Sequence, residues 1–348
     1  MTKDSLANPL LSVEDLHVEF DTYGGTVQAV RGISFDIYPG KTLAIVGESG
    51  CGKSVTVQSI MGLIPMPPGR ITKGTAMLKG QNIINNTTIN GAEIRGSEIG
   101  MIFQDPMTSL NPTMTIGKQI GETLTVHRGY TQKQAYARAI ELLDMTHIPE
   151  ARKRASQYPF EFSGGMLQRA MIAVALACEP SILIADEPTT ALDVTIQSQI
   201  LDLMKDLQSQ NNMSVILITH DLGVVARMAD NVLVMYAGQV VERGSAEHIF
   251  YESAHPYTLG LKAAMPSNTS EQEQSLTPIE GSPPDLFSPP VGCAYAARCP
   301  HAMRICGTHA IEQAINLGNG HHSACWLHHK QCNRVVPGIF DNRNAIQS

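Results

Sequence analysis

The fold is decided by the stretch from Thr42 to Ser54, with the sequence TLAIVGESGCGKS. Thr42–Val46 has the apolar run of a buried strand, and Val55–Gly62 has helical spacing. Between them, Gly47–Ser54 fits the pattern G-x-x-x-x-G-K-[ST]. Glycines let backbone N–H groups close around phosphate oxygens, and the helix N-terminus adds the positive end of its dipole. We therefore predict a phosphate-binding loop formed by Gly47, Glu48, Ser49, Gly50, Cys51, Gly52, Lys53, Ser54 and Val55.

Within this loop two side chains have a chemical role. Lys53 brings a positive charge to the β- and γ-phosphates, and the Ser54 hydroxyl can ligate Mg²⁺. Cys51 is expected to contribute only its backbone.

Two adjacent carboxylates end a second predicted strand, Ile182–Ala185. Such a pair is costly at the end of a buried strand unless it binds something. Asp186 is suited to hold Mg²⁺ through water, and Glu187 to orient or deprotonate an attacking water. Acids in this position also cap helices, which is the structural alternative.

Two further predicted strands, Val215–Thr219 and Ile99–Phe103, end in polar residues. His220 follows the first and could reach the γ-phosphate, although a histidine after a strand is often structural. Gln104 follows the second and suits the positioning of water and Mg²⁺. Ser163-Gly164-Gly165 opens the predicted helix Gln168–Ala177 and forms a second anion-binding N-terminus, or an ordinary cap.

The wider pattern predicts an α/β fold with a mostly parallel core sheet, because short apolar runs alternate with helical segments. An antiparallel hairpin is expected around Ala237-Gly238. Further expected elements are the helices Lys133–Met145 and Thr195–Gln208, the strands Leu11–Phe20 and Ile33–Ile37, and the hairpin arms Val232–Tyr236 and Gln239–Glu242.

Composition limits the class of protein. Hydrophobic residues make up 43% and charged residues 16% of the 348 residues, which indicates a globular chain. A formal net charge of −7 gives no reason to expect a nucleic-acid partner. No segment approaches the roughly 20 apolar residues that span a bilayer, and the N-terminus lacks the apolar part of a secretory signal. We therefore expect a cytosolic protein that reaches a membrane only through partner subunits.

The C-terminal part of the chain differs in composition. Residues 266–291 have the character of a linker, and residues 292–332 form a predicted small cysteine-rich module. Its four cysteines suit tetrahedral zinc or a [4Fe–4S] cluster as a structural staple; the absence of C-x2-C pairs favours the cluster, and unligated thiols remain an alternative. These candidate ligands are Cys293, Cys299, Cys306 and Cys325, with Cys332 as a spare. We expect solvated histidines at positions 321, 322, 328 and 329.

The order of these motifs closely resembles that of the ATP-binding-cassette family over about residues 10–244. The resemblance makes Gly47–Ser54 a Walker A motif, Gln104 the Q-loop, and Asp186-Glu187 the Walker B motif. Ser163-Gly164-Gly165 resembles the signature, although Phe162 and Met166 replace its usual outer residues. Ala191-Leu192-Asp193 resembles the D-loop and His220 the switch histidine.

The resemblance implies ATP and Mg²⁺ as ligands, with a cassette over residues 10–265, a helical subdomain over about 105–178 and an antiparallel β subdomain. By position, Phe20 resembles the residue that stacks on adenine, with Tyr23 as its competitor. Two cassettes of this family face each other head to tail, so the signature of this chain is expected to contact the ATP of a partner.

A narrower resemblance, to the ATPases of oligopeptide and dipeptide importers, rests on Gly100–Pro112, His255-Pro256-Tyr257-Thr258 and the terminal cysteines. It also points to the [4Fe–4S] cluster. The implied partners are a second, different cassette, two membrane permease subunits and an extracytoplasmic peptide-binding protein. The implied location is the cytoplasmic face of the plasma membrane. Related cassettes serve the uptake of nickel, antimicrobial peptides or murein peptides. A soluble non-transport cassette and an inactive regulatory cassette are rival hypotheses.

Overall fold

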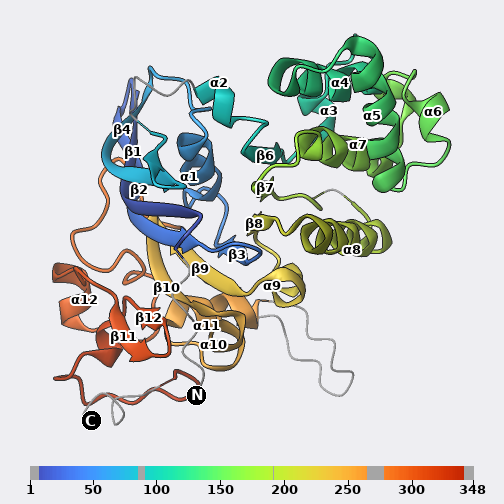
Figure 1. Ribbon diagram of the computed structural model, residues 1–348. Coiled ribbons are helices and arrows are strands. Elements are labelled where there is room, and N and C mark those ends of the chain that lie inside the picture. The colour runs from blue at the N-terminus through green and yellow to red at the C-terminus, as the bar shows by residue number, and fades with distance from the viewer. Residues whose placement is uncertain (1–7, 85–90, 191, 265–277, 341–348) are drawn as a thin grey trace. The chain divides into compact units, whose positions relative to one another are not determined.

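The computed structural model describes residues 8–84, 91–190, 192–264 and 278–340. The chain divides into two compact units, which are described separately (Figure 1). The first comprises residues 1–11, 36–42 and 78–218, and the second comprises residues 12–35, 43–77 and 219–348.

The second unit contains a mixed sheet in the order β11-β12-β10-β9-β3. Strand β3 (Thr42–Val46) runs parallel to β9 (Asn231–Tyr236), and β9 pairs antiparallel with β10 (Gln239–Ser245). The predicted hairpin is confirmed; Ala237 and Gly238 take φ values of 49° and 77°, as a type I′ turn requires. Two short strands complete the sheet, β11 (Ile315–Gly318) and β12 (His321–Ser323).

The same unit carries the N-terminal strands β1 (Leu11–Thr22), β2 (Gly25–Ile37) and β4 (Gly69–Leu78), with β1 between the other two. The two-residue connection between β1 and β2 makes this pair antiparallel. Both predicted N-terminal strands are thus confirmed and are longer than expected. Helix α1 (Lys53–Ile60) follows β3, where the sequence predicts a helix.

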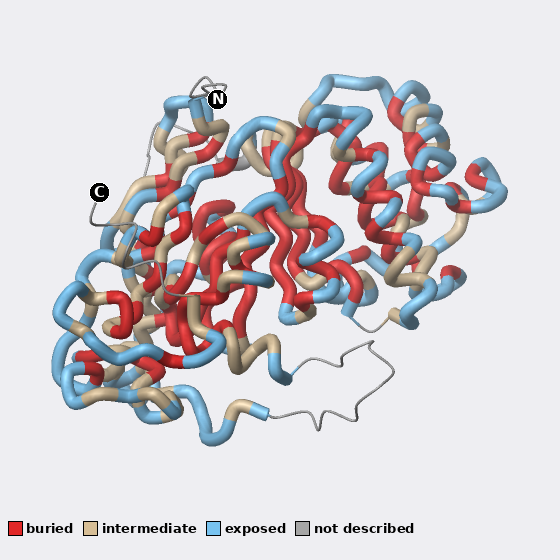
Figure 2. Tube along the Cα trace, turned by 90° about the horizontal axis from the view of Figure 1, so that it is seen from below, coloured by how far each residue is buried: buried red, intermediate tan, exposed pale blue. Residues whose placement is uncertain are grey.

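In the first unit, three parallel strands lie in the order β8-β7-β6. They are β6 (Ile99–Ile102), β7 (Ile182–Asp186) and β8 (Ser214–Thr219). Every residue of the three is buried, as expected for parallel strands covered on both faces. Figure 2 shows this burial along the strands, in contrast to the exposed loops.

Between β6 and β7 the chain forms a group of helices with its own apolar core (Figure 1). The buried members of this core lie between Leu110 and Cys178. The helices are α3 (Pro106–Ser109), α4 (Ile116–Arg128), α5 (Gln132–Met145), α6 (Ala151–Arg154), the 3₁₀ turn Pro159–Glu161 and α7 (Gly164–Leu176). The unit also contains β5 (Gln81–Asn82), α2 (Gly91–Ile94) and the long helix α8 (Val194–Asn211).

The cysteine-rich segment shares a sheet and a core with the preceding part of the second unit. Strand β12 pairs antiparallel with β10, with Ser323 opposite Glu242. Ala294 and Tyr295 belong to the same buried cluster as Val46 of β3. The other elements of this region are α9 (Leu222–Met228), α10 (Ala246–Tyr251), α11 (Pro256–Ala263), α12 (Arg304–Thr308) and the 3₁₀ turn Trp326–His328. Of the expected linker, residues 266–277 lie outside the described residues.

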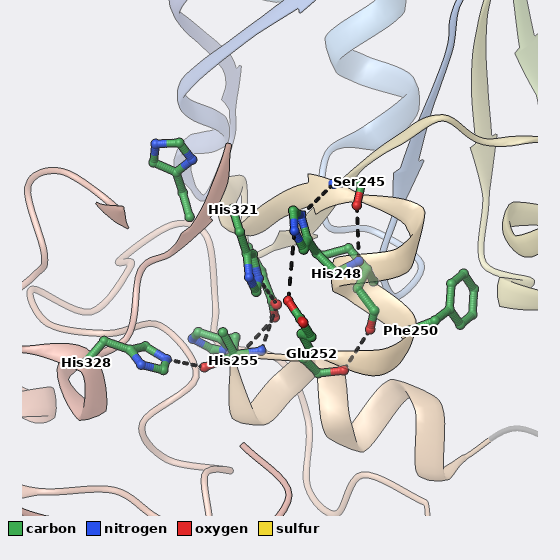
Figure 3. A network of polar contacts seen from close by, with 12 residues as sticks. Ser245, His248, Phe250, Glu252, His255, His321 and His328 are labelled. Atoms are coloured by element: carbon green, nitrogen blue, oxygen red, sulfur yellow. Dashed lines mark hydrogen bonds and ion pairs between the residues drawn. The ribbon is translucent and has the colours of Figure 1, made fainter. Parts of the chain in front are cut away.

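The buried carboxylate of Glu242 joins this segment to the preceding part of the chain; its neighbours His248, His255 and His321 are labelled in Figure 3. Glu242 is 0% exposed and accepts hydrogen bonds from the backbone N–H groups of Ala254 and His255, at 2.7 and 2.8 Å. His321 lies 2.9 Å away through Nε2 and stacks on His248. A buried anion is tolerated only when several donors satisfy it in this way.

The histidines of the C-terminal segment were expected to be solvated, and for two of them this is wrong. His321 is 1% exposed and bonds Glu242, while His328 is 3% exposed and donates from Nε2 to the carbonyl oxygen of Ala254 at 2.6 Å (Figure 3). His322 and His329 are half-buried. The sequence could not reveal this, because their partners lie more than seventy residues away.

No helix in the part of the chain that the structure describes is long and apolar enough to cross a membrane.

We expect Glu242→Ala to lower the free energy of unfolding by about 3 kcal/mol or more, because it leaves several buried donors without an acceptor. Urea-induced unfolding followed by circular dichroism measures the change. The matched control is Glu247→Ala on the exposed side of α10, which should stay within about 0.5 kcal/mol of wild type. Equal stability of the Glu242 variant and the wild type would contradict the assigned role.

Candidate functional site

The phosphate loop lies between the end of β3 and the start of α1. Its glycines are required by contacts as well as by dihedral angles. A Cβ atom on Gly47 would lie 2.2 Å from the carbonyl oxygen of Met235, and one on Gly52 would lie 2.4 Å from that of Ala29. Both residues also have positive φ, 155° and 100°. Only glycine fits there, and the loop is therefore pressed against two neighbouring strands.

Lys53 begins α1 and is 5% exposed. Its Nζ donates to the carbonyl oxygens of Gly47 at 2.8 Å and Glu48 at 3.0 Å. Two backbone carbonyl groups of the loop thus hold the ammonium group in place across the loop. A phosphate oxygen that enters the loop can replace either carbonyl as its acceptor.

The loop has a second set of contacts that sequence reasoning missed. The Glu48 backbone N–H donates to Tyr257 Oη at 2.9 Å, and the Glu48 carboxylate pairs with Arg298 Nη1 at 2.7 Å. Tyr257 belongs to the His255–Thr258 stretch, and Arg298 directly precedes Cys299. The only signal in the sequence was that both residues lie next to motifs already singled out, and this does not predict their contacts with Glu48.

His255 caps the helix that carries Tyr257. Its Nδ1 accepts from the Tyr257 backbone N–H at 3.1 Å. Burial lowers the pKa of His255 to about 4, so the ring is neutral at physiological pH and keeps the lone pair that this bond needs.

In the first unit, β7 ends in the two predicted acids. Asp186 is 4% exposed, while Glu187 is half-buried and has a φ of 48°. The Glu187 N–H donates to the carbonyl oxygen of Ile218 at 2.9 Å, which ties this left-handed residue to β8. A non-glycine residue held in this conformation often marks a functional site.

The side chain of Glu187 meets the predicted Gln104. Gln104 Nε2 donates to Glu187 Oε2 at 3.0 Å, and Thr190 Oγ1 donates to the same oxygen at 2.9 Å. The structure therefore brings together two of the predicted catalytic residues and adds Thr190, which the sequence pattern did not single out. This arrangement can orient a water molecule at the carboxylate.

The remaining motifs of the first unit lie at helix N-termini. Ser163 caps α7 and accepts from the Met166 N–H at 3.4 Å, while a Cβ on Gly164 would meet open space. Asp193 caps α8 by accepting from the Ile196 N–H at 2.8 Å. Both caps are exposed, so an anion can approach the α7 N-terminus. Ala191 lies outside the described residues.

Three predicted site residues of the second unit, His220, Phe20 and Tyr23, differ in their exposure to solvent. His220 is exposed directly after β8, and the following Asp221 caps α9 by accepting from the Gly223 N–H at 2.7 Å. Phe20 is half-buried on β1, while Tyr23 is exposed in the turn after it. Exposure alone does not single out either residue as the one that stacks on adenine.

The four predicted cysteine ligands line one small cavity, together with Tyr295 and Trp326. Burial raises the pKa values of three of these thiols, to about 11 for Cys299 and also above the usual range for Cys293 and Cys325. Across the described ranges, no group of three or more His, Cys, Asp or Glu side chains is arranged to hold a metal ion. Cys332 lies apart from the cavity lining, near Met303 at 3.9 Å between the sulfur atoms.

Comparison with known families gives two matches along the chain. Residues 30–190 match the model of the ABC transporter family, and residues 241–306 match the model described as "Oligopeptide/dipeptide transporter, C-terminal region". The first covers the phosphate loop, Gln104 and both acids. The second covers Tyr257, Arg298 and three of the four cysteines.

Curated relatives are similar over nearly the whole chain. The dipeptide transport ATP-binding protein DppD of Bacillus subtilis is 54% identical over 94% of this chain and 97% of its own length. The oligopeptide transport ATP-binding protein OppD of the same organism is 55% identical, over 94% and 91%. OppD of Salmonella typhimurium is 50% identical, over 90% and 92%.

Solved structures support the fold. A dimeric structure of the ATP-binding cassette MJ0796, bound to ADP and phosphate, is 27% identical with a TM-score of 0.61, over 68% of this chain and 98% of that one. The cassette cbiO1 from Clostridium perfringens is 29% identical with a TM-score of 0.59, over 70% and 91%. The chain therefore has the ABC ATPase fold and belongs to the ABC transporter family, among the oligopeptide and dipeptide transport ATP-binding proteins.

Proposed function

We propose that the chain is the ATP-binding and ATP-hydrolysing subunit of an ABC importer that powers the uptake of oligopeptides or dipeptides. The phosphate loop carries this proposal, because Gly47 and Gly52 make its backbone conformation possible and Lys53 is held across it. The relatives named for dipeptide and oligopeptide transport supply the cargo. Nickel, antimicrobial peptides or murein peptides are the alternative cargo within the same family.

Each site residue has a role in this proposal. The loop Gly47–Val55 binds the phosphates of ATP, Lys53 neutralises the β- and γ-phosphates, and Phe20 or Tyr23 stacks on adenine. Ser54, Asp186 and Gln104 would hold Mg²⁺, and the ion would supply positive charge for the phosphates.

Glu187 is the base or orienting group for the attacking water. Gln104 fixes the carboxylate of Glu187 by the hydrogen bond described above. His220 contacts the γ-phosphate. Ser163, Gly164 and Gly165 face the ATP of a second cassette, and Asp193 serves the contact between the two.

The proposed assembly is a heterodimer of two different ATPase subunits with two transmembrane permease subunits and an extracytoplasmic peptide-binding protein. The chain is peripheral on the cytoplasmic face of the plasma membrane and has no nucleic-acid partner. Its cassette spans residues 10–265, with a linker over 266–291 and a cysteine-rich module over 292–332.

For this module we propose a [4Fe–4S] cluster held by Cys293, Cys299, Cys306 and Cys325. This proposal is supported by the position of the four thiols, which line one cavity. Four thiolates suit either tetrahedral zinc or a cluster, and the absence of C-x2-C pairs in the sequence favours the cluster. The cluster would cross-link the loop-rich segment and would favour thiolates over the neutral thiols that burial otherwise favours.

Glu187→Gln should lower ATP turnover by at least about 100-fold, because the amide cannot accept a proton from water. MgATP binding should stay unchanged, since the amide has nearly the same shape and hydrogen-bonding reach. Steady-state ATPase assays of the assembled complex and equilibrium binding to the full chain measure the two quantities. Glu141→Gln on exposed α5 is the matched control. Wild-type turnover of the Glu187 variant would refute its role.

Anaerobically purified protein should contain about four iron and four acid-labile sulfide per chain. Cys325→Ser should remove most of both, while Cys332→Ser should keep them, because Cys332 does not line the cavity. Metal and sulfide analysis of the three proteins measures the content. Zinc without iron in the wild-type protein would contradict the cluster and favour the alternative.

A further inference from the structure

The phosphate loop has a negatively charged side chain at its second position. Glu48 lies directly after Gly47, and its carbonyl oxygen accepts from Lys53 Nζ at 3.0 Å. The ligand of this loop in the proposed function, ATP, carries several negative charges. A free carboxylate in the loop would therefore oppose binding by direct repulsion.

Arg298 neutralises this carboxylate. The ion pair between Arg298 Nη1 and Glu48 Oε2 measures 2.7 Å, and the arginine side chain is only 6% exposed. Such shielding from water makes the pairing stronger than that of a surface ion pair.

Each nitrogen of the Arg298 guanidinium group donates at least one hydrogen bond, which fixes the direction of the group. Nε and Nη2 donate to the carbonyl oxygens of Glu280 and Ile279, at 2.9 and 3.1 Å. Nη1 also donates to Tyr236 Oη at 3.2 Å, and the guanidinium lies over the ring of Tyr236. Because all three nitrogens of the planar guanidinium group are hydrogen-bonded, the ion pair with Glu48 has little rotational freedom.

The backbone of Glu48 is held from the same side. Tyr257 Oη accepts its N–H at 2.9 Å, and the Tyr257 ring packs against Tyr236 and Tyr295, with centroids 4.6 and 5.3 Å away. Tyr295 and Arg298 both lie in the short loop between Cys293 and Cys299. The loop between Cys293 and Cys299 therefore supports the phosphate loop through the side chains of Tyr295 and Arg298.

From these contacts we propose that Arg298 is a positioning residue for nucleotide binding, which raises affinity for MgATP by neutralising Glu48 and holding it in place. The inference rests on the proposed function, since it concerns the same loop, and it assigns a role to a residue outside the nucleotide-binding motifs named above. It also makes the loop between two cysteines a part of the support of the ATP site.

The test is the dissociation constant of MgATP for the full chain, measured by isothermal titration calorimetry. Arg298→Ala should raise it roughly tenfold, because the carboxylate then repels the phosphates without a counter-charge. Arg298→Gln keeps hydrogen-bond donors and should show a loss of similar size, so it serves if the alanine variant does not fold. Arg304→Ala, an exposed arginine of the same segment, is the matched control and should bind as wild type.

A rescue experiment separates charge from mere support of the fold. In the double variant Arg298→Ala with Glu48→Gln, the repelling charge is gone, and the dissociation constant should return to within about twofold of wild type. A double variant as weak as Arg298→Ala would overturn the inference, and so would wild-type affinity in both Arg298 variants. Absence of MgATP binding to the wild-type protein would instead refute the proposed function.

Discussion

The site depends on the close approach of the phosphate loop to two neighbouring backbone carbonyl groups, those of Met235 and Ala29. This approach is possible only because Gly47 and Gly52 have no side chain. It requires β3 to lie in register beside β9, with Val46 opposite Val234. The buried apolar faces of these strands supply the stabilisation, and the loop conformation follows from where the strands end.

The local patterns were sufficient to predict the strands from whose ends the site residues project, but not β4, β5, β11 or β12. β3 has the predicted bounds, and β7 and β8 are each longer by one residue. Gln104 and Glu187 were predicted from the ends of two different strands, and they meet because β6 and β7 are parallel neighbours. Parallel order brings such ends together, so a one-dimensional pattern was enough.

The parts that could not be predicted depend on partners distant in sequence. Helix α4 was not recognised, because its buried side chains recur only once per turn and two glycines lie beside them. Arg298 was not singled out in the sequence, and its partner Glu48 is 250 residues away. His321 and His328 resembled tail residues for the same reason. Contacts of this range leave no periodic signal in the sequence.

The pairing of β10 with β12 has a consequence for biosynthesis. Glu242 and its partner Ser323 are 323 − 242 = 81 residues apart. At about 5–20 residues per second, a ribosome needs roughly 4–16 s to make this interval. During that time β10 is an open sheet edge, and the carboxylate of Glu242 has no His321 to meet. Until β12 has been made, this edge of the nascent chain is therefore open to edge-to-edge pairing with another chain.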